Sequence, residues 1–150
     1  METTMSWQEL ENQQSELAAF GVERLNGKVA YLATTRKSGA PRVHPITPIV
    51  GRGHLFAFME PTSPKGHDLR RDGRYALHCG VSDTSGGAGE FSVSGTARLV
   101  DEPTLRAMAV ALASYAPADR YVLFEFGVDS AESTTYSDNK PERRQWKLDK

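Results

Sequence analysis

The amino-acid sequence predicts a mainly β fold, an antiparallel β-barrel of six or more strands with a few capping helices. Segments rich in β-branched and aromatic residues recur from about residue 28 onward, and some of them alternate between apolar and polar side chains. Turn-forming residues separate these segments at intervals of roughly ten residues, as in barrels. Closing the sheet also removes the exposed strand edges that promote aggregation.

The length and composition favour one domain over residues 1–150. A chain of 150 residues buries enough surface for one core without a disulfide or a metal. The 18 Lys and Arg residues nearly balance the 19 Asp and Glu residues, so no overall field favours nucleic acid or a membrane as partner. Cys79 is the only cysteine, which fits a reducing compartment, and no signal peptide or membrane-spanning run is recognised. We therefore expect a soluble cytoplasmic protein.

Residues 1–27 are expected to form a helical segment before the barrel. Residues 6–9 have the form of a capping box, in which a serine hydroxyl and a glutamate carboxylate satisfy free amides of the first helical turn. Asn26 and Gly27 end the segment before the period of the sequence changes. The apolar residues that share one helical face are Leu10, Leu17 and Phe20.

The barrel itself is expected to begin with three consecutive antiparallel strands. Glycine-containing segments that suit hairpin turns separate these three strands. A short helix follows, because Pro64 suits a first helical position, where its missing amide hydrogen has no partner to lose. The expected elements are strands at 28–36, 41–50 and 54–60, a helix at 64–71, strands at 74–81 and 90–100, a capping helix that opens at 101–104, a strand at 121–128 and a final hairpin that joins 134–136 to 145–148.

The segment from Thr62 to Asp72 is the most informative part of the chain, because it follows a predicted strand and opens a helix. Two hydroxyls, Lys65 and a helix N-terminus come together there. Free backbone amides and the helix dipole favour an anion, and the lysine adds a full positive charge, so phosphate is a suitable ligand. An ordinary capped surface helix with a solvated lysine fits the same spacing.

Three groups of residues resemble the pyridoxamine 5'-phosphate oxidase-like flavin-binding split barrels, over about residues 29–100. The resemblance implies a homodimer with cofactor sites in the clefts between the subunits. It also implies that the cofactor is FMN or, in one branch of the family, the deazaflavin F420. The matching groups are Ala-Thr-Thr at 33–35 with Gly-Ala-Pro-Arg-Val-His-Pro at 39–45, Ser-Pro-Lys at 63–65 before 68–72, and residues 90–95 leading into Thr-Ala-Arg at 96–98.

The same resemblance implies which residues hold the cofactor. Many family members have an arginine where this chain has Pro64, so one charge-assisted bond to phosphate is missing. No catalytic acid or base is assigned, because hydride transfer is the chemistry of the flavin ring. The implied cofactor residues are Arg42, Val43, His44, Pro45 and Thr47 along the ring, Phe58 and Met59 beside it, Ser63 and Lys65 on the phosphate, and Trp146 from the partner subunit.

The remaining reactive side chains favour structural roles. His54 and His78 are expected only to decorate strands, and the four histidines lack metal-ligand spacing, so no metal site is predicted. Cys79 lies in a predicted strand and is most simply a small buried hydrophobe. The basic segment at 143–147 is too short, and the net charge too balanced, for a nucleic-acid surface.

The resemblance implies an FMN-dependent oxidoreductase that transfers hydride to or from a small organic substrate. The chain has no convincing second basic group that would hold pyridoxamine phosphate, so vitamin B6 synthesis is not expected. Two alternatives stay open. One is an F420-dependent reductase, in which Arg42, Arg70 and Arg71 would meet the longer acidic tail of that cofactor. The other is a flavin- or haem-binding carrier or sensor without turnover.

Overall fold

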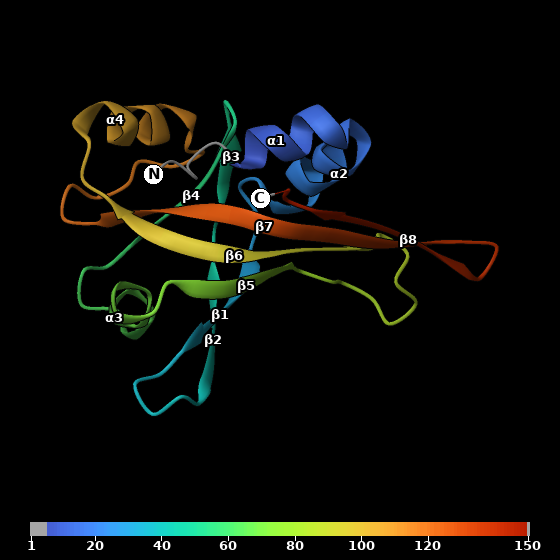
Figure 1. The fold of residues 1–150 in the computed structure, drawn as a ribbon, viewed down its shortest axis with the longest axis horizontal. Helices are drawn as coiled ribbons and strands as arrows, with labels where there is room; N and C mark the ends of the chain where they lie inside the picture. The colour runs from blue at the N-terminus through green and yellow to red at the C-terminus, as the bar shows by residue number, and fades with distance from the viewer. Residues whose placement is uncertain (1–5, 150) are drawn as a thin grey trace.

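The computed structural model describes residues 6–149, which form one antiparallel sheet of eight strands and four helices (Figure 1). The mainly β fold is therefore confirmed. Neighbouring strands follow the order β2-β1-β5-β6-β7-β4-β3, and β8 pairs with β7. The strands are β1 (Ala30–Thr35), β2 (Pro41–Ile46), β3 (Ile49–Gly51), β4 (His54–Met59), β5 (Arg74–Cys79), β6 (Glu90–Val100), β7 (Val122–Ser137) and β8 (Lys140–Lys147). The helices are α1 (Ser6–Gln13), α2 (Ser15–Leu25), α3 (Pro64–Arg71) and α4 (Pro103–Leu112).

The predicted single strand at 41–50 is wrong, because the chain divides there into β2 and β3. Strand β2 pairs with β1, whereas β3 pairs with β4 at the other end of the sheet order. The break falls at Thr47 and Pro48, and proline cannot donate a hydrogen bond within a continuous ladder. Residues 47 and 48 thus connect the two ends of the strand order, which brings the sheet round into a barrel.

The C-terminal strands are longer than the sequence predicts. Residues 121–128 and 134–136 belong to one strand, β7, and β8 begins at Lys140 instead of residue 145. Asp138 and Asn139 form the hairpin turn with φ values of 54° and 64°, the left-handed pair that two-residue hairpin turns require. Only one edge of β8 pairs with another described strand, so Pro141 is tolerated within it.

The N-terminal helical segment is present, but it is two helices. Gln14 separates α1 from α2. The Ser6 hydroxyl, expected in a capping box, instead accepts a hydrogen bond of 2.6 Å from the amide of Val128 and so joins α1 to β7. Helices α1 and α2 lie with α4 on one side of the long strands β6 and β7, while α3 lies on the other side (Figure 1).

Two apolar clusters hold the helices against the sheet. The larger one lies between the first two helices and the strands, and the Phe91 ring meets the rings of Trp7 and Phe20 edge to face at 6.1 and 6.3 Å. The smaller cluster packs α4 onto Phe56 and Leu123. Full burial of each large side chain stabilises the fold by about 1.5–3 kcal/mol. Within residues 6–149, no helix is long and apolar enough to cross a bilayer.

Candidate cofactor site

The N-terminus of α3 is capped as the sequence predicts. Ser63 precedes the helix, and its hydroxyl accepts a hydrogen bond of 3.2 Å from the amide of Gly66. A Cβ atom at position 66 would lie 3.0 Å from that hydroxyl oxygen, so glycine keeps the cap in place. Pro64 has no amide hydrogen, and the amides of residues 66 and 67 bond to Ser63. The amide of Lys65 is thus the donor of this turn that is left for a ligand.

Lys65 carries an uncompensated charge at this helix end. Its side chain is half-buried, and burial lowers the pKa of the ammonium group. Its ammonium group has no hydrogen-bond or ion-pair partner among the residues that the structure describes. A partly desolvated cation without a partner gains free energy from binding an anion.

Asp68, on the inner side of α3, fastens the helix to the sheet. Its carboxylate is 2% exposed and accepts hydrogen bonds from Arg42 Nε at 2.7 Å, Thr34 Oγ1 at 2.8 Å and Arg71 at 3.0 Å. Burial alone would raise the pKa of Asp68, but these hydrogen bonds outweigh it and lower that pKa. The network places β1 and β2 against α3. The sequence pattern had assigned no role to Asp68, although a carboxylate among arginines near a phosphate motif was a usable signal.

The pKa of His44 indicates that positive charges from both β2 and α3 act on this side chain. Burial lowers the pKa of its imidazole, and the charges of Lys65, Arg42 and Arg36 lower it further against the opposing effect of Asp68. The protonated imidazole is therefore disfavoured, and a neutral ring can donate or accept a hydrogen bond. The site combines three cations and one buried carboxylate, so it favours an anion.

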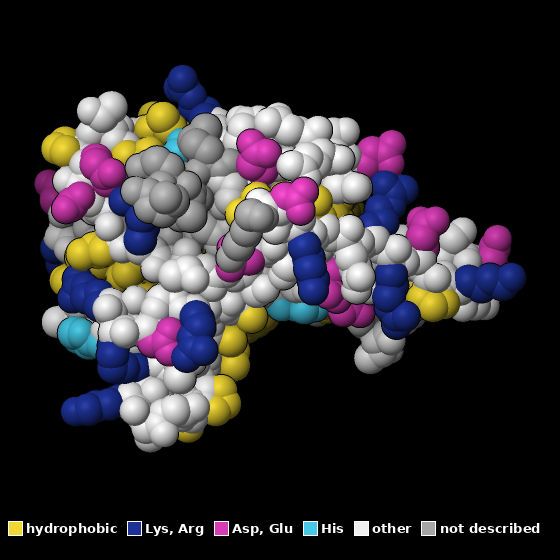
Figure 2. Space-filling model, viewed as in Figure 1, with side chains coloured by type: hydrophobic (Ala, Val, Ile, Leu, Met, Phe, Trp, Pro, Cys, Tyr) yellow, Lys and Arg dark blue, Asp and Glu magenta, His cyan; other side chains and the backbone are white. Residues whose placement is uncertain are grey.

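The N-terminus of α3 and the side chains of β2 that face it form what we call the phosphate corner. Val43 and Pro45 point away from this corner, because side chains alternate along a strand. Val43 is 63% exposed, and it lies near Tyr31 of β1, which is 47% exposed. These strands border a hollow whose opposite side is formed by the hairpin of β7 and β8, and hydrophobic side chains gather on the flank of β1 and β2 (Figure 2). Thr47 is half-buried at the break between β2 and β3.

The structure separates Phe58 from Met59. Met59 lies next to α3, where its sulfur is 3.5 Å from the position that a Cβ on Gly66 would occupy. Phe58 belongs instead to the apolar cluster beneath α4, and the guanidinium of Arg106 lies 5.2 Å from the centre of its ring. Met59 therefore adjoins the phosphate corner, whereas the Phe58 side chain faces α4.

Trp146 lies apart from the residues on β2. It is 6% exposed, and its indole Nε1 donates a 2.9 Å hydrogen bond to Gln13 of α1. Strands β7, β6, β5 and β1 separate its strand from β2 in the sheet order. Because side chains alternate, β8 directs Arg143, Gln145 and Lys147 to the face opposite Trp146.

His54, His78 and Cys79 are the other reactive residues that the sequence analysis considered. His54 does not merely decorate its strand, because it is buried and its Nδ1 lies 2.6 Å from the Glu125 carboxylate. His78 is half-buried, and its Nε2 lies 3.2 Å from Glu90. Cys79 is buried and free, as predicted. Among residues 6–149, no group of three or more histidine, cysteine or acidic side chains is arranged to hold a metal.

The fold is a split β-barrel, and the phosphate corner is its candidate site for a phosphate-bearing ligand. A family model described as pyridoxamine 5'-phosphate oxidase matches residues 18–137. The chain therefore belongs to the pyridoxamine 5'-phosphate oxidase-like split-barrel family, as the resemblance of its motifs implied. A search of curated proteins finds no match.

Solved structures share the fold at low sequence identity. A haem-binding protein from Mycobacterium smegmatis superimposes with a TM-score of 0.66 and 16% identity, over 84% of this chain and 55% of that one, so the chain spans about half of that protein. A NimC/NimA family protein from Clostridium acetobutylicum gives 0.65 and 17%, over 96% and 95% of the two chains. A protein from the same organism, related to general stress protein 26 of B. subtilis, gives 0.61 and 14%, over 93% and 95%.

Proposed function

We propose that the protein is an FMN-binding oxidoreductase that works as a homodimer and transfers hydride to or from a small organic substrate. The observation that carries this proposal is the half-buried, unpartnered Lys65 at the capped N-terminus of α3. Its ammonium group and backbone amide, with the Ser63 hydroxyl proton, supply donors for a terminal phosphate. Family membership supports a flavin as the group that bears this phosphate.

A second copy of the chain is the proposed partner. Val43 and Tyr31 are exposed on the same face of β2 and β1 as diagonal neighbours, and large exposed apolar side chains that cluster are typical of interfaces. The segment from Arg42 to Thr47 would then line a cleft between two subunits, with its backbone along the flavin ring. Arg143 and Gln145 on β8 are the C-terminal residues that we propose for the partner's side of this cleft, in place of Trp146.

The flavin supplies the hydride chemistry when it is bound, and the residues of this chain position and tune it. Lys65 and Ser63 hold the phosphate and so set the depth of the ring. His44, kept neutral by burial and by neighbouring cations, is available to hydrogen-bond the ring or a substrate. A free, buried Cys79 agrees with the reducing environment of the cytoplasm, which we propose as the location.

FMN is preferred to F420 because of the arginines. Arg42 and Arg71, two of the three arginines that could meet the acidic tail of F420, are both bonded to the Asp68 carboxylate. Of these three arginines, only Arg70 is exposed and has no ion pair with a residue that the structure describes. A single exposed arginine is a poor match for a tail with several negative charges.

The test is titration of FMN into the cofactor-free protein and into Lys65→Ala, followed by flavin fluorescence. Loss of one charge-assisted bond, about 1.5–3 kcal/mol, should weaken binding about 10- to 150-fold. Lys37→Ala, in the exposed turn between β1 and β2, is the control and should bind as the parent does. Equal affinities of parent and Lys65→Ala would remove the assigned phosphate site.

The absorbance of the purified protein distinguishes the related alternatives. Flavin bands support the proposal, and reduction of the bound flavin by an electron donor supports an enzyme. A Soret band would favour haem binding instead, in keeping with the haem-binding protein that shares this fold. A colourless protein that quenches F420 fluorescence would favour the deazaflavin. Bound flavin that no donor reduces would indicate a carrier or sensor.

A further inference from the structure

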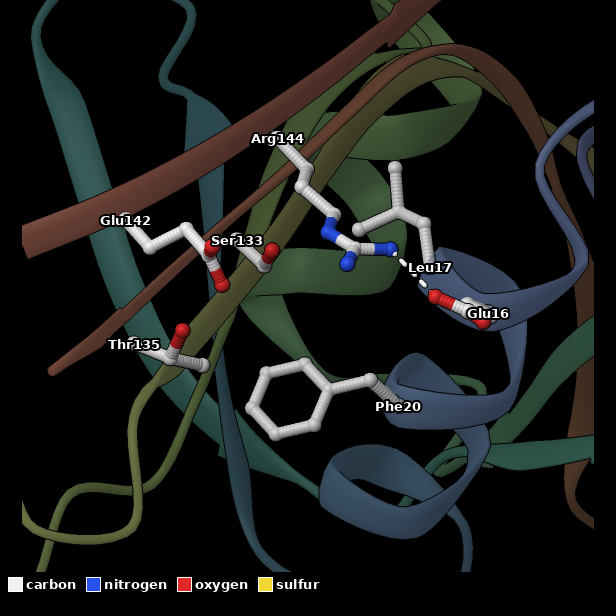
Figure 3. Close-up of a pocket in the computed structure, with 7 residues that line it drawn as sticks. All are labelled: Glu16, Leu17, Phe20, Ser133, Thr135, Glu142 and Arg144. Atoms are coloured by element: carbon white, nitrogen blue, oxygen red, sulfur yellow. Dashed lines mark hydrogen bonds and ion pairs between the residues drawn. The ribbon is translucent and has the colours of Figure 1, made fainter. Parts of the chain in front are cut away.

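A cavity lies on the helix-covered side of the sheet, away from the phosphate corner. Helix α2 forms one wall, and the hairpin of β7 and β8 forms the other (Figure 3). Its volume is about 220 Å³. This is room for several waters, or for one six-membered ring with a short arm.

The charges around this cavity do not balance. Arg144 donates a 2.7 Å hydrogen bond to Glu16, and the carboxylates of Glu16 and Glu142 together raise the pKa of the Arg144 guanidinium. The Glu142 carboxylate itself has no hydrogen bond or ion pair among the described residues, and it points toward the cavity (Figure 3). Two carboxylates therefore face one guanidinium, and the cavity keeps one excess negative charge.

The cavity also has uncommitted polar and aromatic groups. Ser133 is 6% exposed, yet its hydroxyl has no hydrogen-bond partner among residues 6–149 and faces the cavity (Figure 3). Most of the Ser133 side chain is covered, and its hydroxyl is open to the cavity, so a ligand there can complete its hydrogen bonds. The hydroxyl of Thr135 lies on the same side, and the ring of Phe20 forms the apolar wall. The face of an aromatic ring attracts a cation.

We infer that this cavity binds a small organic ammonium ion. The ammonium group would lie between Glu142 and the Ser133 hydroxyl, and the carbon body of the ligand would rest on Phe20. An anionic ligand would have to compete with Glu16 for Arg144 and would add to the excess negative charge. The site is distinct from the proposed flavin site, since none of its residues belongs to β2 or α3 and its β8 residues, Glu142 and Arg144, face away from Arg143 and Gln145.

Titration of benzylammonium into the purified full chain, followed by amide chemical shifts, tests the inference. Saturable shifts should appear at Phe20, Ser133 and Thr135. Glu142→Gln should weaken binding by roughly three- to tenfold, and Phe20→Leu should weaken it as well. Arg144→Gln should instead tighten binding, because it leaves two carboxylates uncompensated.

Glu132→Gln is the matched control, since it removes the same charge from the opposite face of β7 and should leave binding unchanged. Benzyl alcohol, which has a similar shape and no charge, should bind more weakly than benzylammonium. The inference is overturned if benzoate binds at these residues in preference to benzylammonium. It is equally overturned if no saturable shifts occur up to millimolar concentrations, or if they occur at α3 instead.

Discussion

The guanidinium of Arg42 donates from Nε to Oδ2 of Asp68 over 2.7 Å and so joins strand β2 to helix α3. This contact holds together the two segments that the family motifs mark separately in the sequence. It also means that Arg42 acts through Asp68: it positions α3, and with it Lys65, relative to the strand that carries His44.

Replacing Asp68 by Asn should destabilise the fold by about 2 kcal/mol, because partly buried arginines lose a charged acceptor. The lowered pKa of Asp68 also gives a pH dependence. A carboxyl whose pKa is lower in the folded state stabilises the protein above its unfolded pKa, near 4, and this contribution is lost as the pH falls through the folded pKa. Urea unfolding of the parent and Asp68→Asn between pH 3 and about pH 7 should show a difference that shrinks toward acid.

Asp72→Asn is the control for this experiment. Asp72 pairs on the surface with Arg74, which is 78% exposed, and a hydrogen bond from Arg74 lowers the pKa of Asp72 to about 2. Exposed pairs contribute little, so this variant should unfold close to the parent. Losses of the same size at both positions would contradict the structural role given to Asp68.

The pKa of His44 should rise when Lys65 is replaced by Ala. The positive charge of Lys65 is one of the causes that lower this pKa, so its removal moves the pKa upward while the contribution of burial stays. The measurement is an NMR titration of the imidazole in protein free of cofactor. Lys37→Ala should leave the pKa where it is. An unchanged pKa in Lys65→Ala would mean that β2 and α3 are farther apart than the structure places them.

Local sequence signals predicted the elements better than their connections. The cap formed by Ser63 and the first-turn position of Pro64 follow from nearest neighbours in the chain, and both are confirmed. The division of 41–50 into β2 and β3 depends on which strand each half pairs with, and the two partners, β1 and β4, lie near opposite ends of the sheet order. A pattern with a period of two does not carry that information.

The candidate site shows the same division between local and distant causes. The position of Lys65 after a serine and a proline predicted its place at the start of a helix. Its partial burial comes from tertiary packing, which the local sequence does not show. Likewise, the sequence around His54 predicted a strand, but it gave no sign that the His54 side chain meets Glu125, 71 residues away in the sequence. Buried polar pairs of this kind arise only when the strands are assembled.

Replacing Glu125 by Gln should destabilise the protein by about 2–4 kcal/mol. Glu125 is 1% exposed, and its carboxylate lies 2.6 Å from His54 Nδ1 and accepts a 3.2 Å hydrogen bond from Arg98. Removing its charge leaves two buried or half-buried donors poorly compensated. Glu102→Gln, which removes the exposed partner of the same arginine, should cost much less. Comparable midpoints of urea unfolding for the two variants would argue against a buried network.

Replacing Val43 by Glu should convert the proposed dimer into a monomer and weaken FMN binding at the same time. Val43 is 63% exposed on β2, one of the strands that border the hollow. A carboxylate there is well solvated in a single chain, but it must be desolvated if a second copy covers this face, at a cost of several kcal/mol. Light scattering gives the mass, and flavin fluorescence gives the affinity, which should fall at least about tenfold.

Val110→Glu makes the same change on α4, where the valine is 44% exposed, and should leave both the mass and the affinity for FMN unchanged. A monomeric Val43→Glu that binds FMN as tightly as the parent would separate dimerisation from the cofactor site, since each chain would then hold the whole ligand. If the parent itself is a monomer at micromolar concentrations, the exposed residues Val43 and Tyr31 do not form the contact between subunits, and the cleft would have to be built from one chain.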